Sequence, residues 1–258
     1  MNSSFSLNSG GQAFLGFVGS AVMNTVTHPL CTFKNRLMAN KPPFPVSERR
    51  IVCLKALYRG YTDICLTDSA SLVMTYVVNG FLRKNDFSPL ISSALAGVAA
   101  SPVIAVGEAF MVNHQVHLNS SSCNLKMLQN AFRGAGLFAT ILREVPFTVA
   151  LFSFAPKIET WMTFSNQLTS STFSGLISGS ICGAITAPAD RIKTLIQAKN
   201  FSFGQAAKAV GRDLRTNSGQ KRLLLDASTR ALYMGLGVAI LNVINYRLPH
   251  YLPDIMKE

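Results

Sequence analysis

The chain carries little charge, and it has no run of about 20 residues that is free of polar side chains. Charged residues make up 14% of its 258 residues, against roughly 25% in soluble domains. Hydrophobic residues reach 48%, and the mean hydropathy is +0.28. The low charge argues against a large soluble helical protein. The polar interruptions indicate membrane helices that surround a bundle interior or a water-filled cavity.

Patterns typical of enzymes and of metal proteins are also missing. The cysteines form no CxxC pair and the histidines have no metal-ligand spacing, so we expect neither a metal nor a cofactor. Because there is no nucleophile–base array and no phosphate loop, enzymatic activity is not expected. No basic segment precedes the first apolar stretch, and we therefore expect no cleavable signal.

Acidic residues are scarce, with 12 Asp and Glu against 24 Lys and Arg, and the net charge is +12. The bases gather in residues 31–60 and 190–230. Because basic loops stay on the side from which a membrane protein is inserted, these loops are predicted to share one face and both termini the other. The bases lie between apolar segments rather than along one soluble face, so nucleic acid is not expected as a partner.

Apolar length and helix breakers predict six membrane helices. Their expected ranges are 10–38, 61–83, 89–117, 136–161, 167–199 and 230–252. Shorter segments are expected near 47–58, 125–133 and 203–213, the last as an amphipathic helix on the membrane surface. In the fifth helix Gly175, Gly179 and Gly183 are four residues apart, which allows a neighbouring backbone to approach closely.

One charged pattern is the most informative feature of the chain. It reads Pro188-Ala-Asp190-Arg-Ile-Lys193. Asp190 and Lys193 share one helix face because they are three residues apart, and Pro188 bends the helix. Charges at the end of an apolar helix need partners on other helices. The pattern therefore predicts a gate.

Two further copies are less complete. The first, at residues 29–34, keeps the proline and the lysine but has Cys31 at the acidic position. The middle copy can start at Pro102, which leaves both charged positions uncharged, or at Val106, which keeps the acid Glu108 and loses the proline. We favour Val106, because the copies then start at 29, 106 and 188, which are 77 and 82 residues apart.

An aromatic residue and a glycine follow each copy, at Tyr58-Arg59-Gly60, Phe132-Arg133-Gly134 (or Gly136) and Tyr233-Met234-Gly235. Together these patterns resemble the mitochondrial carrier family, over nearly the whole chain. The resemblance implies an all-α membrane protein with six transmembrane helices, in pseudo-threefold repeats at 1–86, 87–164 and 165–258 around a central cavity. It also implies a monomer in the mitochondrial inner membrane, or in another organelle membrane. Cardiolipin is the lipid expected at the short surface helices.

In that family the acid of each repeat pairs with the base of the next. Carried over to this chain, Asp190 is expected to meet Lys34, and Glu108 to meet Lys193. The third pair is Cys31 with Met111, and because both are uncharged, no buried charge is left without a partner. If the middle copy starts at Pro102 instead, only the pair of Asp190 and Lys34 remains.

The resemblance is weaker at the opposite gate, where the family has an aromatic-acid-x-x-base motif late in the even helices. No Phe or Tyr of this chain is followed by Asp or Glu. Charge pairing therefore cannot close the side on which the termini lie, and apolar contacts are the alternative.

Arg143 and Glu144 lie where the family has a substrate contact on the fourth helix. An adjacent base and acid suit a zwitterion, because arginine binds a carboxylate with fork geometry and glutamate binds an ammonium or sulfonium group. An internal ion pair that braces the helices is the alternative. Asp68 is a second acid expected at cavity depth, with a hydrogen-bonded brace between helices as the alternative. Asn242 and Asn245 are expected to contact an adenine or amino acid group.

Within the family, Gln115-Val116-His117 and the segment 141–147 resemble S-adenosylmethionine carriers. This likeness implies a small-molecule substrate, S-adenosylmethionine, exchanged by alternating access. An adenine nucleotide or an amino acid is an alternative of the same class. A carrier fold that no longer transports and serves as a scaffold or insertase is an alternative of another class, which the missing acids favour.

Overall fold

The structure, a computed structural model, describes residues 7–42, 57–116, 135–162, 164–199 and 201–256, which form helices and their connections. The long helices are α1 (Ser9–Met38), α3 (Tyr61–Lys84), α4 (Pro89–Val116), α6 (Ala135–Val149), α8 (Gln167–Lys199) and α10 (Asn217–Arg247). The short ones are η1 (Ala150–Phe154), α7 (Ala155–Trp161), α9 (Phe203–Leu214), η2 (Leu248–Tyr251) and η3 (Asp254–Met256). The segment expected near 125–133, and most of the one near 47–58, lie outside the described residues.

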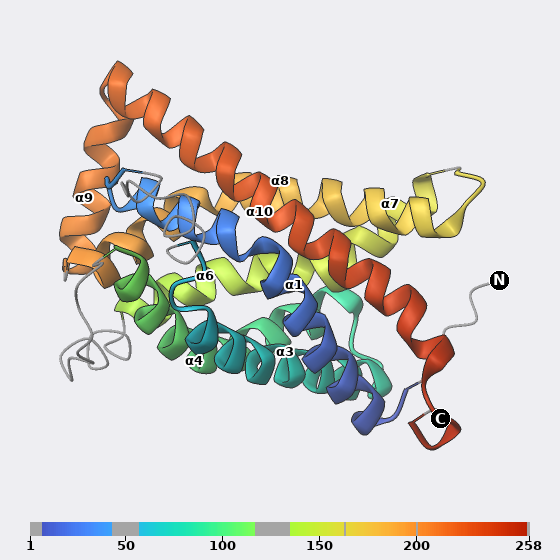
Figure 1. The fold of residues 1–258 in the computed structure, drawn as a ribbon. Coiled ribbons are helices and arrows are strands. Elements are labelled where there is room, and N and C mark those ends of the chain that lie inside the picture. The colour runs from blue at the N-terminus through green and yellow to red at the C-terminus, as the bar shows by residue number, and fades with distance from the viewer. Residues whose placement is uncertain (1–6, 43–56, 117–134, 163, 200, 257–258) are drawn as a thin grey trace.

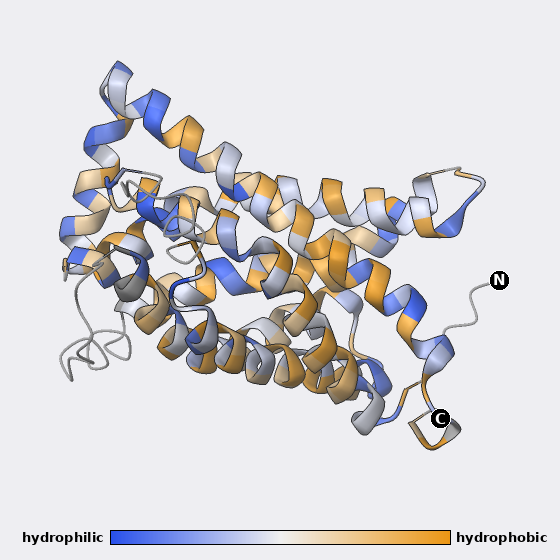
Figure 2. Cartoon of the chain, viewed as in Figure 1, coloured by the Kyte–Doolittle hydropathy of each residue, from blue (hydrophilic) through white to orange (hydrophobic). Residues whose placement is uncertain are grey.

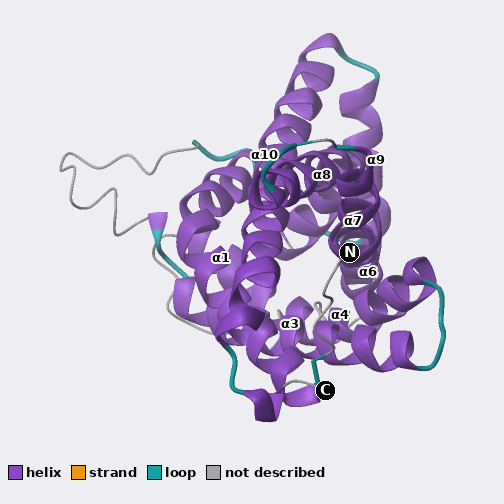
Figure 3. Cartoon of the chain, turned by 90° about the vertical axis from the view of Figure 1, so that its right-hand side faces the viewer, coloured by secondary structure: helices purple, strands orange, loops and turns teal. Residues whose placement is uncertain are grey.

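The long helices form a closed ring, because each packs against the next one along the chain and α10 packs back against α1 (Figures 1 and 3). The chain ends and the turn between α3 and α4 lie at one end of the ring, which we call the terminal end (Figure 1). α9 lies at the other, which we call the basic end. The described residues are therefore all-α, as the sequence predicted, and their long helices enclose a ring.

Five described helices are long and apolar enough to cross a membrane by length and composition: 61–84, 89–112, 136–161, 167–199 and 217–251. α1 is not among them, although it is 30 residues long. Its middle carries Asn24, Thr25 and His28, which lower its mean hydropathy. Two of these, Asn24 and His28, are buried inside the ring and so do not face the surroundings.

Many large apolar side chains of the long helices are exposed, and hydrophobic residues recur along these helices (Figure 2). Phe17, Leu66, Phe81 and Ile185 are between 57% and 73% exposed. Soluble monomers rarely expose large contiguous apolar patches, because such surface is unfavourable in water. A surface of this kind suits contact with lipid chains.

α8 and α10 pack with their backbones in close contact at the glycines four residues apart in α8. A Cβ atom at Gly179 would lie 2.5 Å from the carbonyl oxygen of Met234 and 2.9 Å from Cα of Gly235. At Gly183 a Cβ would lie 2.8 Å from the carbonyl oxygen of Arg230. Only glycine allows this approach, and the approach places the α10 side chains near the central axis.

Two helices differ from the sequence expectation. The last one begins at Asn217 rather than near residue 230, with the Thr216 side chain accepting a hydrogen bond from the Gly219 amide. Its polar first turns hid this start, because the expectation relied on apolar length. They are held by a buried ion pair between Asp226 of α10 and Arg191 of α8.

The helix expected over 136–161 is interrupted by the π-helical turn η1, in which the Ala155 amide donates to the Ala150 carbonyl. Pro156 follows directly, and because it has no N–H it cannot donate to the carbonyl of Phe152. The wider turn relieves this mismatch and re-aims the end of the helix.

We predict that Gly179→Ala lowers stability by about 1–3 kcal/mol, because the added methyl group forces α8 and α10 apart. Thermal unfolding of the detergent-purified protein measures the effect. Gly211→Ala on α9 is the matched control, since no atom lies within 4 Å of the Cβ position there. Equal melting temperatures for Gly179→Ala and Gly211→Ala would contradict the close packing.

Candidate functional site

Two buried ion pairs link the long helices toward the basic end. Lys34 Nζ of α1 lies 2.6 Å from Asp190 Oδ2 of α8. Lys193 Nζ of α8 lies 2.6 Å from Glu108 Oε2 of α4. All four side chains are buried, so each charge depends on its partner rather than on water. The structure thus brings together both pairs that the sequence patterns suggested.

Asp190 has more partners than the sequence indicated. Arg230 Nη1 of α10 lies 2.7 Å from Asp190 Oδ2, and Lys193 Nζ lies 3.5 Å from Oδ1. Arg143 Nη1 lies 3.9 Å from Oδ1. Sequence reasoning missed Arg230, because it precedes the recognised motif. Its spacing of three residues from Tyr233, which places both on one helix face, is the signal that could have found it.

Arg143 lies between two carboxylates. One terminal nitrogen forms an ion pair with Glu108 of α4, and the other pairs with Glu144, its neighbour on α6. Glu108 therefore bridges Arg143 and Lys193. In this conformation Arg143 and Glu144 form the internal ion pair that the sequence left open as an alternative to a substrate contact.

The third contact of the ring is uncharged. Cys31 Sγ lies 3.9 Å from Met111 Sδ, and both side chains are buried. Pro102 lies inside α4, six residues before Glu108, whereas Pro188 precedes Asp190 by two. The middle copy thus keeps its proline about one helical turn early and keeps its acid in the ring.

A central cavity of about 40 Å³ lies among these charges. Its charged lining residues are Asp68, Glu108, Arg143, Glu144 and Arg230. Its apolar lining residues include Met23, Ile64, Met111, Phe147, Tyr233 and Met234. Pockets for small molecules usually measure roughly 300–1,000 Å³, so this conformation is closed around a space too small for a metabolite.

The remaining predicted residues differ in their placement. Asp68 lines the cavity and accepts a hydrogen bond of 2.8 Å from Asn24. The Asn242 amide donates to the Ser171 carbonyl of α8, and Asn245 Oδ1 accepts from the Tyr76 hydroxyl of α3. Neither asparagine is among the described cavity residues, because both amides join α10 to neighbouring helices here.

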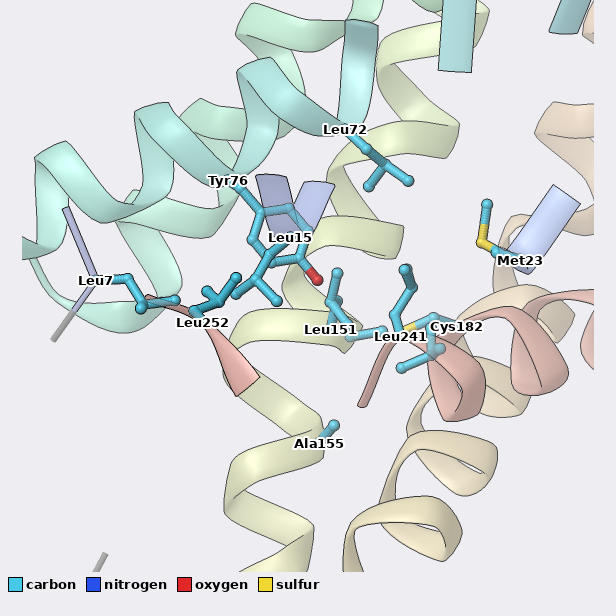
Figure 4. Packing of buried hydrophobic residues seen from close by; sticks show 12 residues of the cluster. Leu7, Leu15, Met23, Leu72, Tyr76, Leu151, Ala155, Cys182, Leu241 and Leu252 are labelled. Carbon is cyan, nitrogen blue, oxygen red and sulfur yellow. The ribbon is translucent and has the colours of Figure 1, made fainter. Parts of the chain in front are cut away.

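An apolar cluster fills the ring toward the terminal end (Figure 4). Leu15 and Met23 of α1, Leu72 and Tyr76 of α3, Leu151 of η1, and Cys182 of α8 join Leu241 of α10 in it. Leu7 and Leu252 extend it, and the chain ends are tied by a hydrogen bond from Asn8 Nδ2 to the Ile255 carbonyl. Apolar contacts thus occupy the end at which the sequence lacks acids for a charged gate.

We predict that Cys31→Asp or Met111→Lys alone lowers the melting temperature strongly, because each leaves a buried charge without a partner. The double substitution is expected to recover most of the loss, since the two new charges face each other. The uncharged pair Cys31→Asn and Met111→Gln serves as the control. If the melting temperature of the double variant falls by as much as the two single losses added together, the two positions do not contact each other.

A family profile described as "Mitochondrial carrier protein" matches residues 164–250. The S-adenosylmethionine carrier 1, chloroplastic/mitochondrial, of Arabidopsis thaliana is 27% identical, over 95% of this chain and 82% of that protein.

Two further relatives match over shorter stretches. The mitochondrial glutathione transporter SLC25A40 of Danio rerio is 26% identical over 62% of this chain and 49% of its own length. An uncharacterized mitochondrial carrier of Schizosaccharomyces pombe is 30% identical over 57% of this chain and 54% of its own length. These two matches span about half the length of each relative.

Proposed function

The chain is a divergent member of the mitochondrial carrier family, and on that premise we propose that it exchanges S-adenosylmethionine across an organelle membrane by alternating access. The substrate carries a carboxylate, an ammonium group and a sulfonium group. In the proposed site Asp68 and Glu144 receive the cationic groups, and an arginine of the cavity receives the carboxylate.

The numbers of acids and bases around the cavity are the main support for a substrate that has charges of both signs. The four bases of the ion-pair cluster are Lys34, Arg143, Lys193 and Arg230. Four acids stand against them: Asp68, Glu108, Glu144 and Asp190. A nucleotide with several phosphates would meet as many negative groups as positive ones and would lack the surplus of bases that it needs. A substrate that carries both signs finds a partner for each.

The relatives support the same choice among charged metabolites. The match to the S-adenosylmethionine carrier extends over most of both chains, whereas the match to the glutathione transporter covers about half of that protein. Glutathione has a net negative charge at neutral pH, whereas S-adenosylmethionine has a net positive one. The charged side chains that line the cavity are three acids and two arginines, a set that suits the positive substrate better.

The observed conformation corresponds to an occluded state in the proposed cycle. Ion pairs around Asp190 lie toward the basic end, and the apolar cluster fills the terminal end. Substrate can enter only if one end opens and the cavity of about 40 Å³ expands severalfold. Opening has a free-energy cost at either end, and substrate contacts that differ between the states offset it.

We further propose the mitochondrial inner membrane as the location, with an acidic lipid at α9. A hollow of about 580 Å³ runs along this amphipathic helix, beside Lys208, Arg212 and Arg215. Basic side chains on a surface helix attract anionic headgroups. The hollow contains no described acid in its lining, which separates it chemically from the central cavity.

Asp68→Asn provides the test of the proposed site. Asp68 is hydrogen-bonded to a neutral amide, so its neutralisation leaves no described ion pair broken. We predict at least a tenfold loss of S-adenosylmethionine exchange in proteoliposomes, because the cationic substrate loses a carboxylate partner, while the melting temperature changes little. Asp63→Asn on the same helix is the matched control, because Asp63 does not line the cavity.

Unchanged exchange by Asp68→Asn would remove this residue from the substrate site. If the wild-type protein exchanges neither S-adenosylmethionine, nor nucleotides, nor amino acids, the transport proposal fails. The scaffold or insertase alternative would then be favoured. The apolar filling of the terminal end is the observation that speaks for it.

A further inference from the structure

We propose that Arg230 is the residue that binds the carboxylate of the substrate, while Asp68 binds a cationic group of the same substrate. This inference rests on the proposed exchange of a zwitterionic substrate and specifies how the cavity recognises it. Arg230 lies on α10 and Asp68 on α3, and both line the central cavity. A ligand in the expanded cavity can therefore contact both.

Arg230 is fully buried but only partly satisfied. Its Nε donates to the Thr186 hydroxyl at 3.0 Å, and its Nη1 lies 2.7 Å from Asp190 Oδ2. Among the described residues, neither terminal nitrogen donates a hydrogen bond of good geometry, and the ion pair with Asp190 is formed through Nη1, which leaves Nη2 as a donor to spare. Buried polar groups are nearly always paired, since leaving one unpaired has a substantial free-energy cost. The free donor of a cavity-lining guanidinium therefore points to an anionic ligand.

The other bases of the cavity region are already occupied. Both terminal nitrogens of Arg143 pair with carboxylates, one with Glu108 and one with Glu144. The single nitrogen of Lys34 lies against Asp190, and that of Lys193 lies against Glu108. A substrate carboxylate could reach any of these three only by displacing an acid of the protein. Arg230 can bind it while keeping its contact with Asp190.

Asp68 is the complementary case among the acids. Its only described side-chain hydrogen bond comes from the neutral amide of Asn24, and no described base forms an ion pair with it. Glu108, Glu144 and Asp190 each pair with at least one base. The cavity thus presents one cation and one anion with unused capacity, on α10 and α3, the two neighbours of α1 in the ring. This arrangement selects a substrate that carries a carboxylate and a cationic group.

The proposed binding site of the carboxylate is linked to the ion pairs at the basic end through Asp190. Arg230 contacts Asp190 through Nη1, and Asp190 holds Lys34. A carboxylate bound at Nη2 would share the charge of the guanidinium with Asp190 and so weaken the attraction between Arg230 and that acid. Substrate binding would in this way favour opening at the basic end, which is the coupling that exchange requires.

The test compares S-adenosylmethionine with its decarboxylated analogue, which keeps both cationic groups. We expect wild-type protein in proteoliposomes to exchange the carboxylated ligand with a KM at least tenfold lower, because only this ligand fills the free donor of Arg230. In Arg230→Gln the two KM values should become nearly equal. Because the variant also loses the contact between Arg230 and Asp190, kcat is expected to change for both ligands alike, and the ratio of the two KM values is the readout.

The controls separate binding from structure. Arg247→Gln removes the same charge from an exposed position on the same helix and should keep the wild-type discrimination. Arg143→Gln, if it retains a cooperative melting transition, tests the competing base. Discrimination that survives in Arg230→Gln, or that disappears only in Arg143→Gln, overturns the assignment while exchange itself stands.

Two other outcomes are equally informative. If the KM values of both ligands rise by the same factor in Arg230→Gln, so that their ratio stays as in the wild type, Arg230 has a purely structural role. This result would also overturn the assignment. Wild-type protein that exchanges neither ligand would refute the proposed function and this inference together. Exchange by the wild-type protein thus tests the proposed function, and the ratio of the two KM values in the variants tests the role of Arg230.

Discussion

The structure depends on one buried carboxylate. Asp190 has no exposed surface, and bases from four helices, Lys34, Arg143, Lys193 and Arg230, lie within 3.9 Å of it. A buried charge without partners is strongly unfavourable, so the acid and its bases must stay together or become hydrated together. This requirement fixes the rotation of α1, α6, α8 and α10 about their axes. It also explains why so many charges can occupy the interior of an otherwise apolar ring.

The two ends of the ring are closed by different physical means. Ion pairs lie toward the basic end, where separation requires that water or a substrate replace each partner. Leucine, tyrosine and sulfur-containing side chains fill the terminal end, where separation exposes apolar surface. The close packing of α8 on α10 through Gly179 lies between these ends and gives a rigid wall for both. A carrier built in this way would respond to salt and to substrate charge mainly at one end.

Much of this arrangement could be read from the residues. The charged pattern at 188–193, the lysine of the first copy and the choice of Glu108 in the middle copy supply the charges, and the resemblance to the carrier family implies the pairing that is observed. Apolar length placed four helices within a few residues of their observed bounds, and the predicted span 136–161 matches α6, η1 and α7 together. It failed for α10, because the first turns of that helix are polar and are stabilised by a distant partner, Arg191. The roles of Asn242 and Asn245 could not be judged, since an amide on a helix suits a substrate or a neighbouring helix equally well.

The sequence by itself determined the helices, their order and the set of charges that must find partners, because these depend on apolar length, short-range spacing and the cost of burying charge. Only the tertiary structure decided how the partners are shared. Arg143 is held by two acids, whereas Arg230, outside every recognised motif, keeps a free donor beside Asp190. Such sharing depends on distances between side chains that are far apart along the chain, and the packing of six helices around one axis sets those distances.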